Sequence, residues 1–271
     1  MDHHRLNEFA LRRNEYSGDL LLLVKGSVTY KPIISRAFSH LYFSRTFEDR
    51  QGEHTWGSYI KGASDSDFEG IEQLCRVLKG HIYLVDDLDE CYALGYHSEL
   101  SAAGRYQRTV LGQLVRDAKP YDSGWNAGSK AEADKLATLM IDFFILLHPT
   151  YTRADMVIAV PPSNPDKPFD LPTYLVEQIT AQVSFINATG AVRKIRHTRP
   201  MKECRTMEEK INNIKDAFDV DANVFQNRSV MVIDDIYQTG FSMNELGRML
   251  RLAGAKSVLG LAATKTAQDL T

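Results

Sequence analysis

The chain has 271 residues, of which 44% are hydrophobic, and its formal charge at pH 7 is −3. This composition predicts a globular protein that is soluble and can bury one core or somewhat more. No apolar run reaches the roughly 18 residues of a membrane-spanning helix, and the first residues lack the apolar centre of a signal peptide, so we expect neither secretion nor a membrane partner. The three cysteines have no CxxC spacing, which suits a reducing cytoplasm and predicts no structural zinc.

Residues 1–104 predict a small mixed α/β domain, because short apolar runs at 20–24, 59–60 and 82–85 are separated by glycine and charge. Aromatic and basic residues are concentrated between positions 30 and 56 and could stack on nucleobases. Aromatic residues pack a small core more often than they bind bases, and both interpretations stay open. The residues concerned are Tyr30, Lys31, Arg36, Tyr42, Phe43, Arg45, Phe47 and Trp56.

Residues 82–89, IYLVDDLD, form a second apolar run that ends in acids. The spacing of Asp87 and Asp89 is compatible with the nucleophile and acid of a haloacid-dehalogenase-type phosphatase, with Asp234 and Asp235 as Mg²⁺ ligands. No Thr-Gly pair follows to make a phosphate loop. We therefore favour a solvated acidic strand end here.

Residues 120–185 predict alternating helix and strand. The capping-box spacing of Ser129 and Glu132 predicts a helix that begins at Ser129 and runs towards Pro149, after a loop. Residues 155–160 then predict a buried strand, followed by a proline-rich loop and a helix-like stretch from 171 to 185.

A basic segment follows, in which seven Lys or Arg and three acids lie between Arg193 and Lys210. Such an excess is usually a solvated face. Nucleic acid is a competing ligand for it.

Residues 230–242, VMVIDDIYQTGFS, are the most informative part of the chain. The apolar run fits a strand buried on both faces of a parallel sheet, and ligands of such sheets bind beyond the carboxyl ends of the strands. The carboxylates of Asp234 and Asp235 suit hydrogen bonds from vicinal hydroxyls, or Mg²⁺ held through water.

The loop after these acids has the features of a phosphate site. Ser242 and Glu245 have capping-box spacing, which predicts a helix from Ser242 that ends before Gly254. Backbone N–H groups at its N-terminus and the hydroxyls of Thr239 and Ser242 would hold a phosphate dianion. A phosphorylated sugar would satisfy both the acids and the loop.

Residues 230–242 resemble the thirteen-residue signature of type I phosphoribosyltransferases, which bind 5-phosphoribosyl 1-pyrophosphate. Thr239, Gly240 and Ser242 match, whereas Gln238 is usually Thr or Ser and Phe241 is usually small. The region from about 105 to 271 is similar to the ComF-like branch, which is associated with DNA uptake. Further fragments carry that similarity: residues 155–169, residues 196–200, Lys210, Asn213, Ala217 and Phe218. ComF relatives commonly carry an N-terminal zinc-binding cysteine cluster, which the sequence lacks.

The resemblance implies an α/β fold, with a type I phosphoribosyltransferase-like parallel sheet flanked by helices and an N-terminal mixed α/β extension. Residues 1–104 would form the hood that recognises an acceptor, and 105–271 the transferase domain. The implied reaction transfers the phosphoribosyl group to an unknown acceptor and releases pyrophosphate, with Mg²⁺ as cofactor. A homodimer is common in this fold.

The resemblance also assigns site residues. Catalytic and Mg²⁺-binding roles fall to Asp234 and Asp235. The 5-phosphate would be bound by Tyr237, Gln238, Thr239, Gly240, Phe241 and Ser242. Pyrophosphate would be bound by Pro162, Ser163, Asn164, Lys167, Arg199 and Lys202.

Two other classes of function bear on the acidic strand. A nucleotide-binding Walker B strand looks similar, but the sequence has neither GxxxxGK[ST] nor GxGxxG. A non-catalytic regulator of the transferase fold, which senses the sugar pyrophosphate or binds nucleic acid, is the main alternative to an enzyme. The departures at Gln238 and Phe241 make that alternative a serious one.

Overall fold

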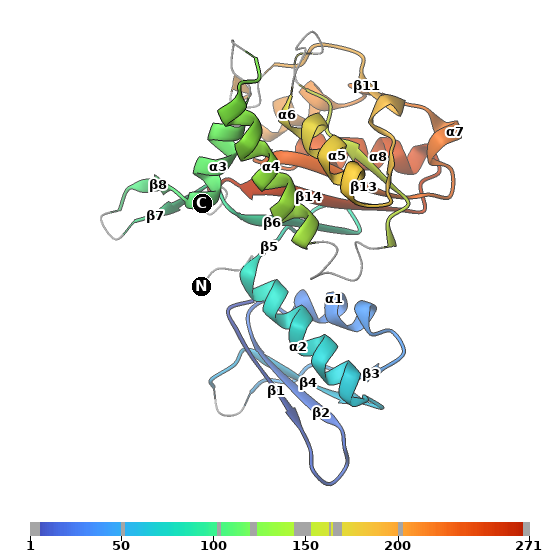
Figure 1. Cartoon of the computed structure of the whole chain (residues 1–271). Helices are drawn as coiled ribbons and strands as arrows, with labels where there is room; N and C mark the ends of the chain where they lie inside the picture. The colour runs from blue at the N-terminus through green and yellow to red at the C-terminus, as the bar shows by residue number, and fades with distance from the viewer. Residues whose placement is uncertain are drawn as a thin grey trace.

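The computed structural model describes residues 6–49, 52–101, 104–119, 124–143, 153–162, 164, 170–199 and 203–267. Within these ranges the chain forms a four-stranded sheet, a six-stranded sheet and two two-stranded sheets. Figure 1 shows the four-stranded sheet, built from the N-terminal part of the chain, below the six-stranded one.

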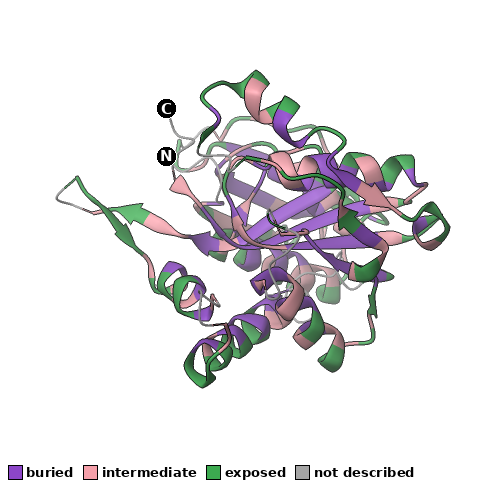
Figure 2. Cartoon of the chain, turned by 90° about the horizontal axis from the view of Figure 1, so that it is seen from above, coloured by how far each residue is buried: buried purple, intermediate pink, exposed green. Residues whose placement is uncertain are grey.

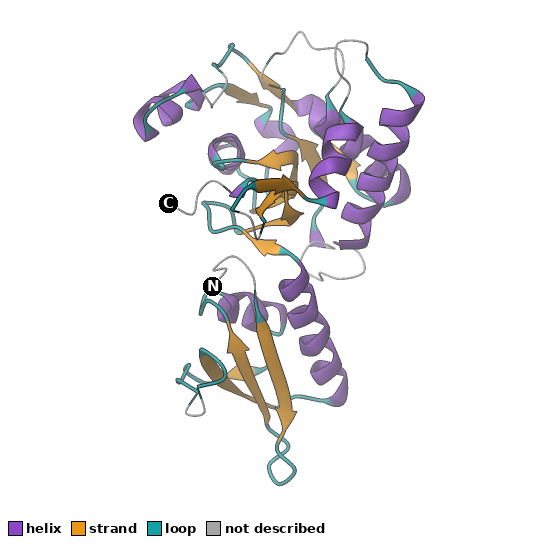
Figure 3. Cartoon of the chain, turned by 90° about the vertical axis from the view of Figure 1, so that its left-hand side faces the viewer, coloured by secondary structure: helices purple, strands orange, loops and turns teal. Residues whose placement is uncertain are grey.

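The N-terminal sheet is antiparallel, in the order β1-β2-β4-β3. Its elements are β1 Glu8–Arg13, β2 Leu20–Lys25, α1 Tyr30–Ala37, β3 Tyr42–Phe43, β4 Trp56–Lys61 and α2 Asp65–Gly80. Both helices pack on one face of the sheet, which Figure 3 shows from the side. Tyr30 and Trp56 are buried in this core, so for these two aromatic residues the core-packing interpretation is confirmed.

The six-stranded sheet has the order β10-β9-β13-β14-β6-β5, and all its pairs are parallel except β5 with β6. The strands are β5 Ile82–Tyr83, β6 Glu90–Tyr96, β9 Met156–Ala159, β10 Ile186–Asn187, β13 Ser229–Tyr237 and β14 Ser257–Lys265. β5 and β6 precede the boundary expected near residue 104, yet both belong to this sheet. The larger unit therefore begins soon after α2.

Helices cover both faces of the six-stranded sheet, which confirms the predicted α/β fold class with a mostly parallel sheet. One face carries α3 Val110–Ala118, α4 Ala127–Ile141 and α5 Leu171–Gln182, and the other carries α6 Met207–Ile214, α7 Ala222–Phe225 and α8 Phe241–Leu252. Along β13, Met231 and Ile233 pack in the first core and Val230 and Val232 in the second. Figure 2 shows the buried strands between these helix layers.

The remaining elements are short. They are the hairpin of β7 Ser98–Leu100 with β8 Tyr106–Arg108, the antiparallel pair of β11 Val192–Lys194 with β12 Phe218–Val220, and the 3-10 helix Thr189–Ala191. The β7–β8 hairpin projects from the body of the molecule (Figure 2). No helix among the described residues is long and apolar enough to cross a membrane.

α4 begins earlier than the sequence predicted. Asn126 is its N-cap and forms a capping box with Ser129, so Ser129 lies inside the first turn rather than at the cap. Glu132, the expected partner of Ser129, forms an ion pair with Lys135 at 2.7 Å instead. The predicted cap was wrong because Asn126, three residues upstream, starts the helix earlier and accepts the N–H of Ser129. Residues 144–150 lie outside the described part of the chain.

Candidate functional site

The carboxyl end of β13 lies between the carboxyl ends of β9 and β14. Asp234 and Asp235 are near this end, and the strand continues to Tyr237, four residues beyond the end of the apolar run at Ile233. Asp234 lies opposite Ala262 of β14. The sequence therefore brings both acids to the edge of the sheet where ligands of parallel sheets bind.

Asp235 forms an ion pair that the sequence did not predict. Its Oδ2 atom is 2.7 Å from Nζ of Lys119, the residue that caps the C-terminus of α3. The side chains of Lys119 and Asp235 are 32% and 16% exposed, so solvent reaches both groups. The hydroxyl of Thr264 donates to the backbone carbonyl of Asp235 at 3.3 Å and fixes the strand there.

Asp234 has a different environment. Its Oδ1 atom accepts a hydrogen bond from the backbone N–H of Asp235 at 2.8 Å. Burial, and next the negative charge of Asp235, raise the pKa of Asp234 well above its usual value, while Lys119 opposes the shift. A cation or a donor of several hydrogen bonds at this edge would favour the ionised pair, because it offsets the repulsion between the carboxylates.

Two further titratable groups surround the pair. Asp170 is the N-cap of α5, and burial together with the charge of Asp235 raises its pKa. His97 follows β6; burial, then the charges of Arg108 and Lys119, lower its pKa. Asp170 precedes a Leu-Pro pair, which is a helix-start signal that could have been recognised in the sequence.

The loop of residues 238–240 joins β13 to α8. Gly240 is the N-cap of α8 with a φ of 76°, so α8 begins at Phe241 and not at Ser242. The expected capping box is absent from this helix start, because the carboxylate of Glu245 accepts the backbone N–H of Asp216 at 2.6 Å. Left-handed backbone at Gly240 turns the chain before Ser242 could act as a cap.

Tyr237 supports this loop from within the protein. Its side chain is 7% exposed and its hydroxyl donates to Oδ2 of Asp86 at 3.2 Å. A Cβ atom at Gly240 would lie only 2.1 Å from that hydroxyl, so the ring lies directly against the turn. Any contribution of Tyr237 to a phosphate site therefore comes from its backbone.

The other predicted phosphate-binding residues lie on the outer side of the turn. Gln238 is exposed, and Thr239 and Ser242 are partly exposed. The first N–H groups of a helix have no intrahelical acceptor, so α8 presents donors beside these hydroxyls. Phe241 lines a groove of about 670 Å³ between α6 and α8, so its side chain faces α6.

The predicted pyrophosphate residues fall on two segments. Pro162 follows β9, where the backbone N–H of Val160 donates to the carbonyl of Ile233 in β13 at 2.9 Å. Asn164 is exposed. Ser163, Lys167 and Lys202 lie outside the described residues.

Arg199 is held through its backbone. Oδ1 of Asn213 accepts the N–H of Arg199 at 3.0 Å, and the amide of Asn213 donates to the carbonyl of Arg199 at 2.8 Å. The side chain of Arg199 is exposed. The two hydrogen bonds fix the position of one residue in the basic segment, and the guanidinium stays accessible.

The chain that follows α6 is attached to α8. Arg248 pairs with Glu245 at 2.7 Å and with Asp216, the residue whose N–H Glu245 accepts. This network joins the chain after α6 to the helix that begins at the 238–240 loop.

Of the acids in residues 82–89, Asp86 reaches the 238–240 loop through Tyr237, whereas Asp89 lies away from the site. Oδ2 of Asp89 accepts the N–H of Val258 at 2.7 Å and pairs with Arg251 at 3.2 Å, at the beginning of β14 and away from the end that carries the site. This position contradicts a phosphatase site that combines Asp89 with Asp234. Asp87 and Asp89 are exposed, as expected for a solvated strand end, whereas Asp86 is half-buried and binds the Tyr237 hydroxyl.

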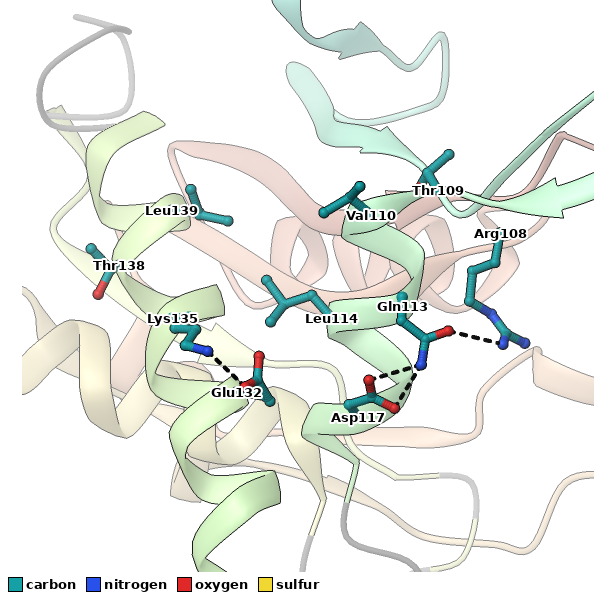
Figure 4. Close-up of a pocket in the computed structure, with 10 residues that line it drawn as sticks. All are labelled: Arg108, Thr109, Val110, Gln113, Leu114, Asp117, Glu132, Lys135, Thr138 and Leu139. Atoms are coloured by element: carbon teal, nitrogen blue, oxygen red, sulfur yellow. Dashed lines mark hydrogen bonds and ion pairs between the residues drawn. The ribbon is translucent and has the colours of Figure 1, made fainter.

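A separate groove of about 850 Å³ lies between α3 and α4 (Figure 4). Glu132 pairs with Lys135 and Gln113 with Asp117, so several of its polar groups bind each other. None of the predicted site residues lines it. In the part of the chain that the structure describes, no group of three or more His, Cys, Asp or Glu side chains could hold a metal ion.

Comparison with known proteins gives limited similarity. No protein-family model matches the chain. Competence protein F of Haemophilus influenzae is 28% identical over 86 residues, which are 31% of this chain and 37% of that protein. The chain thus matches well under half of that relative's length.

Solved structures with a related arrangement were also found. An allosteric regulatory enzyme of purine biosynthesis and the glutamine phosphoribosylpyrophosphate amidotransferase of B. subtilis each give a TM-score of 0.38 at 11% identity. They cover 90% of this chain, and 45% and 46% of their own chains. UMP synthase of Leishmania donovani gives a TM-score of 0.30 at 16% identity over 61% of this chain and 27% of its own. The fold class rests on the sheet order and cores of the chain itself.

Proposed function

We propose that this chain is a phosphoribosyltransferase-like protein that binds 5-phosphoribosyl 1-pyrophosphate and transfers its phosphoribosyl group to an acceptor, releasing pyrophosphate. The observation that carries the proposal is the arrangement of residues 230–242, in which one strand leads through two acids into a glycine turn and a helix N-terminus. The similarity of part of the chain to competence protein F supports it.

The turn would bind the 5-phosphate. The first N–H groups of α8 and the hydroxyls of Thr239 and Ser242 are the donors, and the helix dipole adds positive potential. Gly240 lets the backbone approach the phosphate, and the buried ring of Tyr237 holds the turn in place.

Asp234 and Asp235 would accept hydrogen bonds from the ribose hydroxyls. As the bond to pyrophosphate weakens, positive charge develops on the ribose ring, and the two carboxylates stabilise it. Nζ of Lys119 lies 2.7 Å from Oδ2 of Asp235. This ion pair would therefore break, or the carboxylate would bind both partners, when the ribose hydroxyls bind.

The acid pair fits Mg²⁺ held through water, because Mg²⁺ in such sites keeps several waters and uses one or two carboxylates together with phosphate oxygens. Asp234 and Asp235 are the residues that would hold it. When bound, the ion supplies charge neutralisation to the departing pyrophosphate.

Pyrophosphate would lie between the loop after β9 and the basic segment. Pro162, Ser163, Asn164 and Lys167 belong to the first. Arg199 and Lys202 belong to the second, and closure of residues 196–205 over the site would exclude water.

A regulator that binds the sugar pyrophosphate without turnover is the second candidate. Two observations favour it: the side chain of Phe241 lines the groove between α6 and α8, and Lys119 forms an ion pair with Asp235.

The test is Mg²⁺-dependent binding of 5-phosphoribosyl 1-pyrophosphate, measured by calorimetry. Asp235→Asn and Gly240→Ala are compared with matched controls, Asp65→Asn at a side chain that is 99% exposed and Gly80→Ala where a Cβ meets open space. We expect binding to weaken by tenfold or more in the two site variants only. A wild-type protein that does not bind the ligand refutes both candidates. Binding with pyrophosphate release on adding an acceptor supports the enzyme, and binding without release supports the regulator.

A further inference from the structure

One face of the N-terminal sheet is covered by helices. We call the opposite face the open face, although it is covered in part, because Leu23 on this face is only 6% exposed. Leu20, Leu22 and Val24 of β2 are buried in the core with α1 and α2. Side chains of a strand alternate between faces, so Leu21 and Leu23 point to the opposite side. Cross-strand partners share a face, which places Arg12 and Tyr59 beside Leu21.

Arg12, Leu21 and Tyr59 therefore form one row across β1, β2 and β4. Neighbouring strands are roughly 4.8 Å apart, so this row spans about 10 Å. Lys61 and Tyr42 form the next row, because they are partners across β4 and β3. The two rows make a continuous surface at one end of the sheet.

Two aromatic rings on this face, those of Phe47 and Tyr59, stack on each other. The backbone of Phe47 forms an isolated β-bridge with Gly57. Because Gly57 has no side chain, the ring of Phe47 fits against it. The rings of Phe47 and Tyr59 stack with centroids 5.2 Å apart and an interplanar angle of 29°. Tyr42 is 62% exposed and Tyr59 is 49% exposed. These tyrosine rings keep large apolar areas in water although a core lies on the other side of the same sheet.

The charges on the two sides of the sheet differ. Arg12 and Lys61 are exposed beside the tyrosines on the open face. Glu8 is on the same face but at its other end, paired with Lys25 at 3.4 Å. The acids Asp65, Asp67 and Glu72 belong to α2, which covers the opposite face.

We propose that the open face of the N-terminal sheet binds a single-stranded nucleic acid. Bases would stack on Tyr59, backed by Phe47, and on Tyr42, while Arg12 and Lys61 neutralise phosphates. Exposed aromatic rings flanked by cations are the combination that binds single strands without sequence preference. A peptide partner would not need two cations beside the rings, and a duplex would hide its bases from them.

The proposed contact should not distinguish the ribose of RNA from the deoxyribose of DNA. Of the described residues in the two rows, only the tyrosines carry a side-chain group that can accept a hydrogen bond. Discrimination of RNA from DNA uses hydrogen bonds to the 2′-hydroxyl. DNA and RNA strands of equal length should therefore bind with affinities within a few-fold of each other.

The experiment is fluorescence anisotropy of the full-length protein with labelled oligothymidine and oligouridine of about 12 nucleotides, a length within the range of known single-strand sites. The variants are Tyr59→Leu, Tyr42→Ala and the double variant Arg12→Ala/Lys61→Ala. Matched controls are Tyr16→Ala, at a tyrosine that is 99% exposed in a turn, and Lys79→Ala, an exposed lysine on α2.

We expect each tyrosine variant to weaken binding by about tenfold, as loss of one stacked base does. The double variant should reduce the slope of log affinity against log salt by about 1.4, because each phosphate contact on a single strand contributes roughly 0.7. Both controls, and Asp235→Asn, should bind as the wild type does. Tyr42→Ala keeps the test valid if Tyr59→Leu fails to fold.

Several results would overturn the proposal. They are no binding by the wild type at low salt, equal binding by all variants, a preference for duplex, or a tenfold preference for one sugar. Loss of binding in Arg199→Ala, with none in the variants of the open face, would place the nucleic acid on the basic segment and equally refute it.

Discussion

The Nζ atom of Lys119 lies 2.7 Å from Oδ2 of Asp235, and this ion pair joins the end of α3 to the acidic end of β13. The pair puts a cation of the protein on the carboxylate that the proposed function assigns to ribose hydroxyls and Mg²⁺. Ligand binding would therefore begin by competing with a resident charge.

Lys119→Met should lower the Mg²⁺ concentration needed for half-maximal binding of 5-phosphoribosyl 1-pyrophosphate. A partly exposed ion pair contributes up to about 1 kcal/mol, so its removal should shift this midpoint by roughly fivefold. Calorimetric titrations at a series of Mg²⁺ concentrations measure it. Lys130→Met, at an exposed position of α4, serves as the control. An unchanged or higher midpoint would show that Lys119 does not compete for Asp235.

Gly240→Ala should destabilise the protein, because a left-handed φ costs a residue with a Cβ roughly 1–2 kcal/mol and the new atom would lie 2.1 Å from the Tyr237 hydroxyl. Tyr237→Phe removes that hydroxyl at a cost of about 1 kcal/mol for its hydrogen bond to Asp86. The double variant should be less destabilised than the sum of the single variants, since the closest contact is gone. Denaturant unfolding of all four proteins measures the coupling, and strict additivity would mean that the turn moves away from the ring.

Glu90 should make stability depend on pH. It is 1% exposed, and its burial raises the pKa from 4.5 to about 7 although Arg36 opposes the shift. The folded protein then binds the proton more tightly than the unfolded chain, so the free energy of unfolding should fall as pH rises from about 4.5 to about 7. The full effect is on the order of 3 kcal/mol.

Unfolding of Glu90→Gln and of the wild type between pH 4 and 8 tests this dependence. The variant should lose the fall in stability and be the more stable protein above pH 7. Glu69→Gln, at an exposed glutamate of α2, should keep the wild-type profile. Parallel profiles for Glu90→Gln and the wild type would assign the pH dependence to other groups.

Asn213→Ala should release the backbone of Arg199. Loss of two hydrogen bonds at a side chain that is 9% exposed should destabilise the protein by about 1–3 kcal/mol. Faster amide exchange in residues 195–199 and weaker binding of pyrophosphate should accompany it. Asn212→Ala, at the exposed neighbouring position, is the matched control. Destabilisation with unchanged exchange and affinity would make Asn213 a packing residue only.

Local sequence patterns determined much of the larger unit. The apolar runs that became β9 and β13 are short, continuous and bounded by charge, and only burial on both faces explains such runs. The glycine of the 238–240 turn and the helix that follows it are also local, because left-handed backbone favours glycine. These features predicted the α/β class and the edge of the sheet that carries the candidate site.

The tertiary structure decided the contacts between distant segments. Lys119 pairs with Asp235, and the charge of Asp235 also acts on Asp170 and His97; these groups come from three separate elements, and no spacing in the sequence encodes their proximity. The inward turn of Tyr237 depends on Asp86, which is 151 residues away in the chain. The position of Tyr42 and Tyr59 likewise depends on tertiary structure. The register of the paired strands places both side chains on the face that the helices do not cover. The sequence pattern determines which face of an element is apolar. Tertiary packing determines which residues contact that face and the opposite face.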